Sequence, residues 1–264
     1  VEAPREACQG TQSLGVRLLS APFGIYDYPD PKYREFDGAN ASMLWQLINR
    51  TPAHSQILFE TTSAMAIGTA THWAILEPAA FEISVVRGPE NRRGKQWKEF
   101  VAIHEDQLVL TEKDYDKVLA MRDAVYAVPE AVNLIKANDS QAEQSLIWED
   151  EETGLQCKAK SDLVRAPSRL QVDLKTSADA GEFGKSCASW GYHLQCEHYR
   201  SGLEAITGDP CDFVFLVVEK DSNLVAMYRL DEEAQAEGRA ARRAALALYK
   251  QCRDEGVFPG YPST

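Results

Sequence analysis

The sequence predicts a mixed α/β domain, in which helices come first and a sheet with helices between its strands follows. Three observations lead to this fold class: helical periodicity in the N-terminal third, two strand patterns joined by a turn at residues 151–154, and further strand patterns that alternate with helices. With 264 residues, 44% of them apolar, the chain can build a proper core. We expect a lead-in at residues 1–20 and a single domain over residues 21–264.

The N-terminal half supplies the expected helical flank. Residues 22–38 are rich in Pro, Gly, Asp and Tyr, which indicates an ordered but irregular loop. Asn40 or Ser42 can cap a short helix after it, and Thr111 can cap a later one. The helices of this half are expected at residues 40–52, 62–78 and 111–128.

The C-terminal half supplies the expected sheet. Residues 143–164 predict the two strands of a hairpin, and residues 169–177 predict a third strand. A helix follows, with residues 192–208 as its clearest part. Residues 211–230 predict two more strands around a polar turn. Residues 231–252 predict a last, Ala-rich helix with acids in its first turn, where the helix dipole favours them.

Composition and charge restrict the function classes. The net charge of −12 argues against a general nucleic-acid binder, whose surface is usually basic. An enzyme that holds a divalent metal with carboxylates can nevertheless be acidic overall and line one channel with Lys and Arg. The longest apolar runs, such as residues 213–218, are too short to span a bilayer, so we expect no membrane partner. No basic-then-apolar leader opens the chain, so we expect no secretory signal.

The cysteines indicate a reducing compartment. None of the six forms a C-x-x-C pair, which argues against a zinc ribbon or a standard iron–sulfur site. A chain of this size does not need disulfides for stability, so we interpret the cysteines as reduced and the protein as cytoplasmic. The cysteines stand at positions 8, 157, 187, 196, 211 and 252.

The segment QVDLKTSAD, residues 171–179, carries the first candidate chemistry. Its alternation puts Asp173 and Lys175 on one face of a strand. Asp162 ends the second hairpin strand eleven residues earlier, and a return strand would bring it close to Asp173. Two neighbouring carboxylates repel each other unless a cation lies between them, and Mg²⁺ suits such a site. Lys175 could then orient or deprotonate a water or stabilise phosphate charge. The competing interpretation is a surface D-x-K ion pair worth under roughly 1 kcal/mol.

Two further residues are candidate metal ligands. His72 lies in GTATHW, where small residues let a helix approach a sheet closely, and neutral imidazole is a competent ligand. Glu143, at the start of the first hairpin strand, is a weaker candidate, as a supporting acid. A zinc hydrolase that uses His72 with His193 or His198 is a rival interpretation. It ranks low because the last two are five residues apart, whereas zincins use an i, i+4 spacing.

Two other groups are candidate DNA contacts. Gln195 and Tyr199 lie four residues apart on one helix face, where an amide and a hydroxyl could contact phosphate or ribose. The same spacing also suits an ordinary, partly exposed helix face. Arg92, Arg93 and Lys95 lie in NRRGKQWK, a cationic segment that could grip a DNA backbone or simply be a solvated loop.

Four segments in order resemble the nuclease domain of exonuclease VIII (RecE), in the PD-(D/E)xK nuclease superfamily. The resemblance runs from about Gly24 to FPGY near the C-terminus. It implies an α/β (α+β) fold with a central mixed β-sheet flanked by helices, and a metal-dependent phosphodiesterase. The segments are AIGTATHWAILEPAAF, AEQSLIWEDEETGLQCKAKSD, VDLKTSADAGEF and YHLQCEHYRSGL.

The resemblance also implies roles for particular residues. Lys175 would be the catalytic lysine, and Gln195 and Tyr199 match a Q-x-x-x-Y element that would lie near the DNA strand. The leading Pro-Asp of the superfamily is Ser161–Asp162 here, which changes backbone stiffness but not ligand chemistry. The residues that would hold Mg²⁺, with Mn²⁺ as a substitute, are His72, Asp162, Asp173 and the carbonyl of Leu174.

The activity that the resemblance implies is digestion of linear double-stranded DNA from its ends, 5′ to 3′ and without ATP. The product would be a 3′ single strand for homologous recombination. Members of the family assemble into rings, so we expect a ring, with a tetramer favoured over a trimer, and a RecT-like single-strand annealing protein as partner. A catalytically inactive DNA-binding or scaffold domain with the same fold is the alternative. The intact set of Asp162, Asp173 and Lys175 argues against it.

Overall fold

A single mixed sheet forms the centre of the molecule. The structure, a computed structural model, describes residues 23–57 and 62–262, so the predicted lead-in at residues 1–20 lies outside the described part. The sheet has six strands in the order β1-β4-β5-β6-β7-β8. These strands are β1 (Gly24–Tyr26), β4 (Gln141–Glu149), β5 (Gln156–Arg165), β6 (Leu170–Ser177), β7 (Asp212–Glu219) and β8 (Val225–Tyr228).

The strand directions explain why the sheet is mixed. The neighbours β4–β5 and β5–β6 are antiparallel, as short connections allow. The pair β6–β7 is parallel, and the chain between these two strands forms α8 and α9, the kind of long crossover that a parallel pair needs. The pairs β7–β8 and β1–β4 are antiparallel and complete the two edges. The expected central mixed sheet is therefore confirmed.

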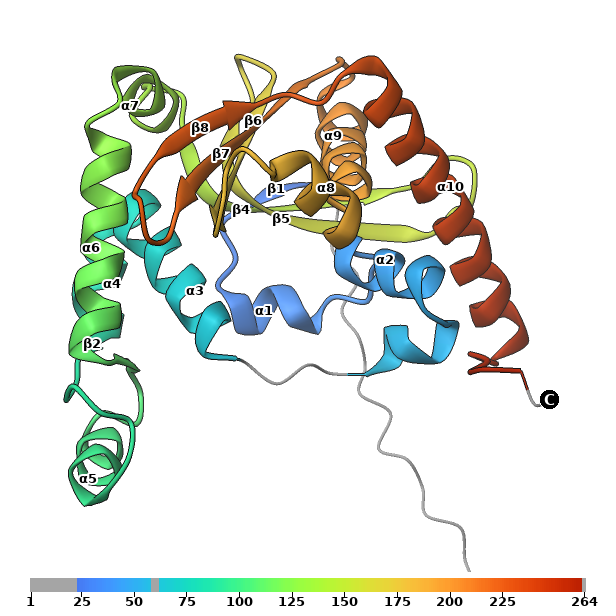
Figure 1. The fold of residues 1–264 in the computed structure, drawn as a ribbon. Helices are drawn as coiled ribbons and strands as arrows, with labels where there is room; N and C mark the ends of the chain where they lie inside the picture. Colours follow the sequence, from blue (N-terminus) through green and yellow to red (C-terminus); the bar gives the residue numbers. More distant parts are fainter. Residues whose placement is uncertain (1–22, 58–61, 263–264) are drawn as a thin grey trace, which may run out of the picture.

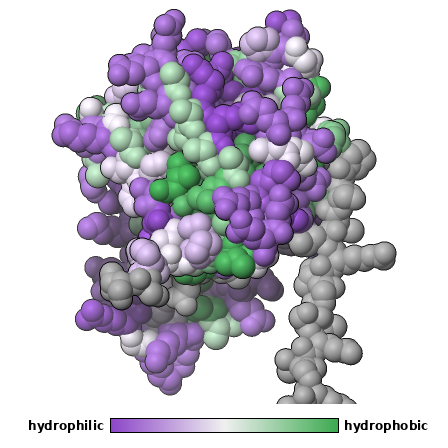
Figure 2. All heavy atoms as spheres, turned by 90° about the vertical axis from the view of Figure 1, so that its right-hand side faces the viewer, coloured by the Kyte–Doolittle hydropathy of each residue, from purple (hydrophilic) through white to green (hydrophobic). Residues whose placement is uncertain are grey.

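Helices cover both faces of this sheet, and Figure 1 shows α6 and α10 on its opposite sides. Helices α3, α4, α6 and α7 supply apolar side chains to one core, which includes Val172 and Leu174 of β6. Helices α2, α9 and α10 supply a second core around Trp148 of β4. The face of the molecule that carries α10 is largely hydrophilic, with an apolar strip down its middle (Figure 2). The helix bounds are α1 (Asp30–Glu35), α2 (Ala41–Asn49), α3 (Ser63–Leu76), α4 (Pro78–Ser84), α5 (Lys95–Ile103), α6 (Glu112–Tyr126), α7 (Pro129–Ile135), α8 (Phe183–Trp190), α9 (Tyr192–Thr207) and α10 (Glu232–Glu255).

The predicted helix starts are confirmed at the level of single hydrogen bonds. The Asn40 side chain accepts from the Met43 backbone N–H at 3.0 Å, and the Thr111 hydroxyl accepts from that of Asp114 at 3.1 Å. Each bond satisfies one of the backbone donors that a helix start leaves unpaired. Asn40 rather than Ser42 is thus the cap of α2.

The predicted irregular loop at residues 22–38 is wrong for most of its described part. This segment contains β1 and α1. Ile25 pairs with Leu146 of β4, and the Lys160 ammonium of β5 donates to the Tyr28 carbonyl at 3.2 Å. The partners that order the segment are far away in the sequence, so its Pro- and Gly-rich composition does not reveal them.

The cationic segment at residues 91–98 is also only partly a loop, because α5 begins at Lys95. Close to it, β2 (Val85–Arg87) and β3 (Leu108–Leu110) form a small parallel pair that was not predicted from the sequence. In the described part of the chain, no helix is long and apolar enough to cross a membrane. All five cysteines in that part are buried and free.

Candidate active site

The candidate site lies where β5 and β6 separate. Their antiparallel ladder runs from Arg165 opposite Leu170 to Leu163 opposite Val172. Beyond that pair, the Asp162 carboxylate accepts a hydrogen bond from the Leu174 backbone N–H at 2.7 Å. A side chain thus replaces the next ladder contact. The strands part there, and acidic residues occupy the opening.

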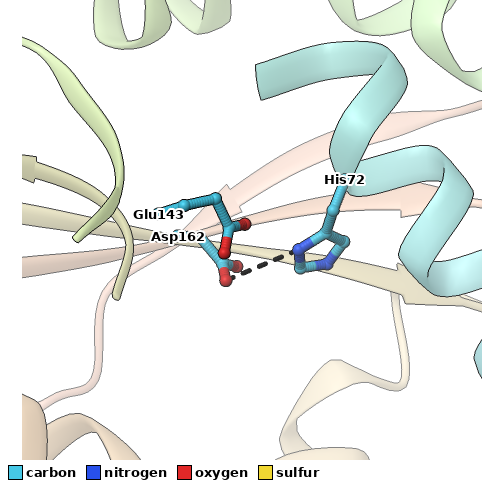
Figure 3. A group of neighbouring side chains, drawn as sticks. All are labelled: His72, Glu143 and Asp162. Atoms are coloured by element: carbon cyan, nitrogen blue, oxygen red, sulfur yellow. Dashed lines mark ion pairs between the residues drawn. The ribbon is translucent and has the colours of Figure 1, made fainter. Parts of the chain in front are cut away.

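Three side chains from three elements meet at this opening, as Figure 3 shows: His72 of α3, Glu143 of β4 and Asp162 of β5. One ligand atom from each lies within 4.8 Å of the others. His72 Nδ1 is 3.4 Å from Asp162 Oδ1. Two carboxylates and one imidazole at this spacing fit a divalent cation.

The backbone brings Glu143 into the group. Its neighbours Ala142 and Gln144 pair with Leu163 and Ser161, so Glu143 stands opposite Asp162 on the adjacent strand. Like charges directly opposite each other destabilise a sheet. Glu143 also has a φ of 51°, a left-handed conformation that is uncommon outside glycine and is often found at functional sites. A bound cation would relieve the repulsion between the two acids, so the residues present fit a metal.

The protonation states in this group are coupled. Burial and the charge of Asp162 raise the pKa of Glu143 to about 8, so Glu143 carries a proton at neutral pH. Burial opposes the charged form of His72, but the carboxylate of Asp162 outweighs it and raises the His72 pKa. Burial likewise opposes the charged form of Asp162, and His72 and Lys175 nevertheless hold its pKa below the usual value. A cation that binds here must therefore displace protons.

Asp173 and Lys175 form a second group beside the first. Asp173 is 1% exposed; its carboxylate pairs with the Lys175 ammonium and accepts from Gln195 Nε2 at 2.7 Å. Burial and the charge of Asp162 raise the pKa of Asp173 to about 6, although Lys175 opposes the rise. The Lys175 ammonium lies 4.7 Å from the centre of the Tyr192 ring. The structure thus places Asp173 against Lys175 and outside the group of three.

The predicted helix face at Gln195 and Tyr199 points toward this second group. Gln195 holds Asp173 through its side-chain amide. Burial raises the pKa of Tyr199 well above its ordinary value. Leu174 contacts Asp162 through its backbone N–H, so the expected role of its carbonyl as a ligand stays a prediction.

Lys160 borders the site, although no motif in the sequence points to it. Its ammonium lies 3.8 Å from Glu143 Oε2 and 2.7 Å from Asp30 Oδ1. It thereby joins the N-terminal segment to the candidate metal group. Lys160 precedes Asp162 by two residues on β5, so strand alternation could have placed both side chains on one face.

The basic residues Arg92, Arg93 and Lys95 do not join the group at His72. They lie on or just before α5, which Figure 1 shows at the foot of α6, away from the sheet. Arg92 pairs with Asp114 at 2.8 Å, and Lys95 pairs with Glu99 at 3.4 Å. Their role in DNA binding remains a prediction.

The geometry does not support the zinc-hydrolase interpretation. His198 is buried against the Lys158 carbonyl at 3.2 Å, and burial lowers its pKa to about 3. His193 Nδ1 faces the Cys187 carbonyl at 3.4 Å. Neither belongs to the metal-competent group around His72, the one such group of three in the described residues.

A sheet that separates at an aspartate, with D-x-K on the next strand, defines the PD-(D/E)xK class of domains. Residues 32–263 match the model of a family described as a PDDEXK-like domain of unknown function (DUF3799). The match spans most of the chain, which therefore belongs to this family.

One solved structure agrees with this fold. A candidate exonuclease from Eubacterium rectale superposes with a TM-score of 0.63 at 12% identity, covering 90% of this chain and 97% of that one. A phage-related exonuclease from Haemophilus somnus 129PT gives a TM-score of 0.35 at 15% identity, with 84% and 97% covered. At such identities the first likeness concerns the fold alone, and the second is too slight to add to it. Among curated proteins there is no significant match.

Proposed function

We propose that this protein is a Mg²⁺-dependent, ATP-independent exonuclease that digests linear double-stranded DNA from 5′ to 3′. The observation that carries the proposal is the opening between β5 and β6. It sets His72, Glu143 and Asp162 directly beside the pair of Asp173 and Lys175. A cation site next to a buried acid and an ammonium is suited to hydrolysis of a phosphodiester.

His72, Glu143 and Asp162 would hold the cation, with Asp173 at the edge of the site. Carboxylate oxygens favour Mg²⁺ or Mn²⁺. When bound, such an ion would polarise the phosphate and lower the pKa of a bound water.

Lys175 supplies a positive charge beside the reacting phosphate. Burial alone would lower its pKa, but Asp173 and Asp162 raise it above the usual value, so Lys175 keeps its proton at neutral pH. It therefore acts by positioning the attacking water and by stabilising charge on the phosphate, rather than as a base. Gln195 holds Asp173 in place and so fixes the ammonium indirectly. Preorganised charges of this kind are usually the largest contribution to catalysis.

The direction of digestion, the 3′ tail, the ring and the annealing partner come from the resemblance to exonuclease VIII. An acidic protein that threads DNA through a ring would keep its basic groups on the inner surface. This arrangement would reconcile a net charge of −12 with a DNA substrate.

The test is digestion of linear double-stranded DNA labelled at either the 5′ or the 3′ end, with Mg²⁺, with Mn²⁺ and with EDTA. We expect metal-dependent release of 5′ label without ATP and no action on closed circles. Asp162→Ala and Asp173→Ala should abolish release and keep the fold, whereas Asp139→Ala, in a loop near Arg165, should keep activity. Strong residual activity in both site variants would overturn the assignment. Absence of cleavage with either metal, together with retained DNA binding, would favour the inactive scaffold.

A further inference from the structure

A pocket opens directly beside Lys175. It has a volume of about 280 Å³ and lies between the end of β6, the segment that follows it, and helix α8. This volume is near the lower end of small-molecule sites, roughly 300 Å³. It leaves room for a single unpaired nucleotide and not for a duplex. Because Lys175 lines this pocket as well as the candidate active site, an occupant would lie next to the scissile phosphate.

The pocket stands at a position where α/β sheets commonly bind ligands. The strands β6 and β7 are parallel neighbours, and both end at the pocket. The Lys220 backbone N–H, just after β7, donates to the Ser177 carbonyl at 2.9 Å and holds the two strand ends together. Carboxyl ends of parallel strands form the crevices in which ligands of open α/β sheets bind.

The lining combines an aromatic surface with cations. Trp190, the last residue of α8, lines the pocket and is 67% exposed, which is unusual for so large an apolar side chain. Tyr192 adds a second ring, and Ser186 adds a hydroxyl. Lys220 contributes an ammonium that forms no ion pair within the described ranges. An exposed ring beside cations is the combination that binds single-stranded nucleic acid, by stacking and by attraction of the phosphate.

Two acids also line the pocket and restrict where an anion can lie. Glu182 pairs with Lys185, and Asp179 Oδ1 accepts from the Gly181 backbone N–H at 2.8 Å. Both acids belong to the segment after β6 and the start of α8. The acids therefore oppose an anion near the start of α8, whereas Lys175 and Lys220 attract a phosphate.

We propose that this pocket binds one unpaired nucleotide of the strand being cut, with its base against Trp190 and its phosphate toward Lys175 and Lys220. The inference rests on the proposed nuclease function and adds a binding site to it. It implies that the end of the duplex is opened by at least one nucleotide before cleavage.

The test is a titration of the protein with deoxyadenosine 5′-monophosphate, in the presence and absence of Mg²⁺, followed by tryptophan fluorescence. Stacking on Trp190 should quench part of the emission of the wild type, and Trp190→Phe should abolish that quench. Equilibrium dialysis should then show binding weakened about ten-fold or more in Trp190→Ala and little changed in Trp190→Phe. Ile103→Ala, which changes an exposed apolar side chain on α5, should behave as the wild type.

The phosphate contact has its own matched pair of variants. Lys220→Gln should weaken binding of the monophosphate but not of deoxyadenosine. Lys250→Gln should change neither, because Lys250 lies on α10, pairs with Asp254 there, and does not line the pocket. A quench that persists in Trp190→Phe, or equal effects of the two lysine variants, would overturn the proposed site.

The pocket and the exonuclease activity can be tested separately, because nucleotide binding and DNA cleavage are measured independently. Cleavage of linear DNA by the wild type without any binding of the monophosphate would overturn the pocket and leave the exonuclease. Binding that depends on Trp190, with no cleavage under any metal, would overturn the exonuclease and leave a nucleotide site. Absence of both would overturn both proposals.

Discussion

Glu143 and Asp162 stand opposite each other on adjacent antiparallel strands, and their carboxylates share one small group with His72. Such an arrangement is unfavourable in the absence of a cation, because burial and mutual repulsion raise the pKa of Glu143 to about 8. The two acids thus destabilise the metal-free protein at the point where the sheet opens. This cost has measurable consequences for stability, for metal binding and for pH dependence.

Glu143→Gln should distinguish two effects of this carboxylate: the loss of stability that it causes without metal, and the stabilisation that it provides when metal binds. At neutral pH the folded wild type must keep a proton on Glu143, whereas the amide of the variant is already neutral, so the free energy of unfolding without metal should rise by roughly 1–3 kcal/mol. In the wild type, Mn²⁺ at about 100 times its dissociation constant should add about 2.7 kcal/mol. The variant should lose most of that gain at the same concentration. Thermal unfolding with and without Mn²⁺ measures both effects.

Glu149→Gln is the matched control, because Glu149 is an exposed acid on the same strand. It should retain the full stabilisation by Mn²⁺. An equal gain in Glu143→Gln and Glu149→Gln would show that Glu143 is not a ligand.

The pH dependence of the metal-free protein should carry the signature of Glu143. Its pKa is about 8 in the folded state against 4.5 for an ordinary glutamate, so the folded state binds more protons between these values. Stability from this group is therefore present below about pH 4.5 and declines as the pH rises toward 8, by at most about 1.4 kcal/mol per unit. Urea unfolding of wild type and Glu143→Gln at several pH values measures the difference. If the free energy of unfolding changes with pH in the same way for the wild type and the variant, Glu143 does not carry the extra proton in the folded state.

Much of the fold could be predicted from local sequence signals. The hairpin, strand β6 and the long helices follow from apolar periodicity, and the caps at Asn40 and Thr111 follow from the chemistry of helix starts. The segment with β1 and α1 could not be found in this way. Its order comes from β4 and from Lys160, which belong to distant parts of the chain.

The sequence predicts which residues form the candidate site better than it predicts how their side chains are arranged. The D-x-K alternation and the hairpin place Asp162, Asp173 and Lys175 near one another. Periodicity does not tell which way a buried carboxylate turns, and here Asp173 turns to Lys175 and Gln195. The close approach of Glu143 to His72 and Asp162 depends on its left-handed backbone, which no local sequence pattern predicts.

Lys175→Gln should abolish cleavage while keeping the cation site. Loss of the ammonium removes the charge beside the phosphate, and we expect a loss of at least about 10²-fold in kcat. Manganese should still stabilise the variant, because His72, Glu143 and Asp162 are unchanged. Steady-state digestion and thermal unfolding with Mn²⁺ provide the two readouts. Lys250→Gln, which changes a lysine on α10, is the control, and a variant at Lys175 with near wild-type kcat would exclude its catalytic role.

Asp150→Asn should destabilise the fold through a network that anchors α10. The Asp150 carboxylate is buried and pairs with Arg242 at 2.8 Å and with Arg243 at 3.0 Å. Removing its charge leaves the buried Arg242 without a counter-ion, which should cost about 3 kcal/mol. Asp212→Asn, which breaks an exposed pair with Arg229, should cost less than about 1 kcal/mol. Urea unfolding at pH 7 compares the two variants.

The same network should also respond to acid. Burial opposes the charge of Asp150, but the two arginines and Thr153 hold its pKa at about 2, below the usual 3.8. Its contribution to stability is therefore full above about pH 4 and is lost as the pH falls toward 2. Because Asp150→Asn has no such proton to gain, its stability should fall less steeply over this interval than that of the wild type. Equal steepness in the two proteins would mean that the acid sensitivity of the fold lies in other carboxylates.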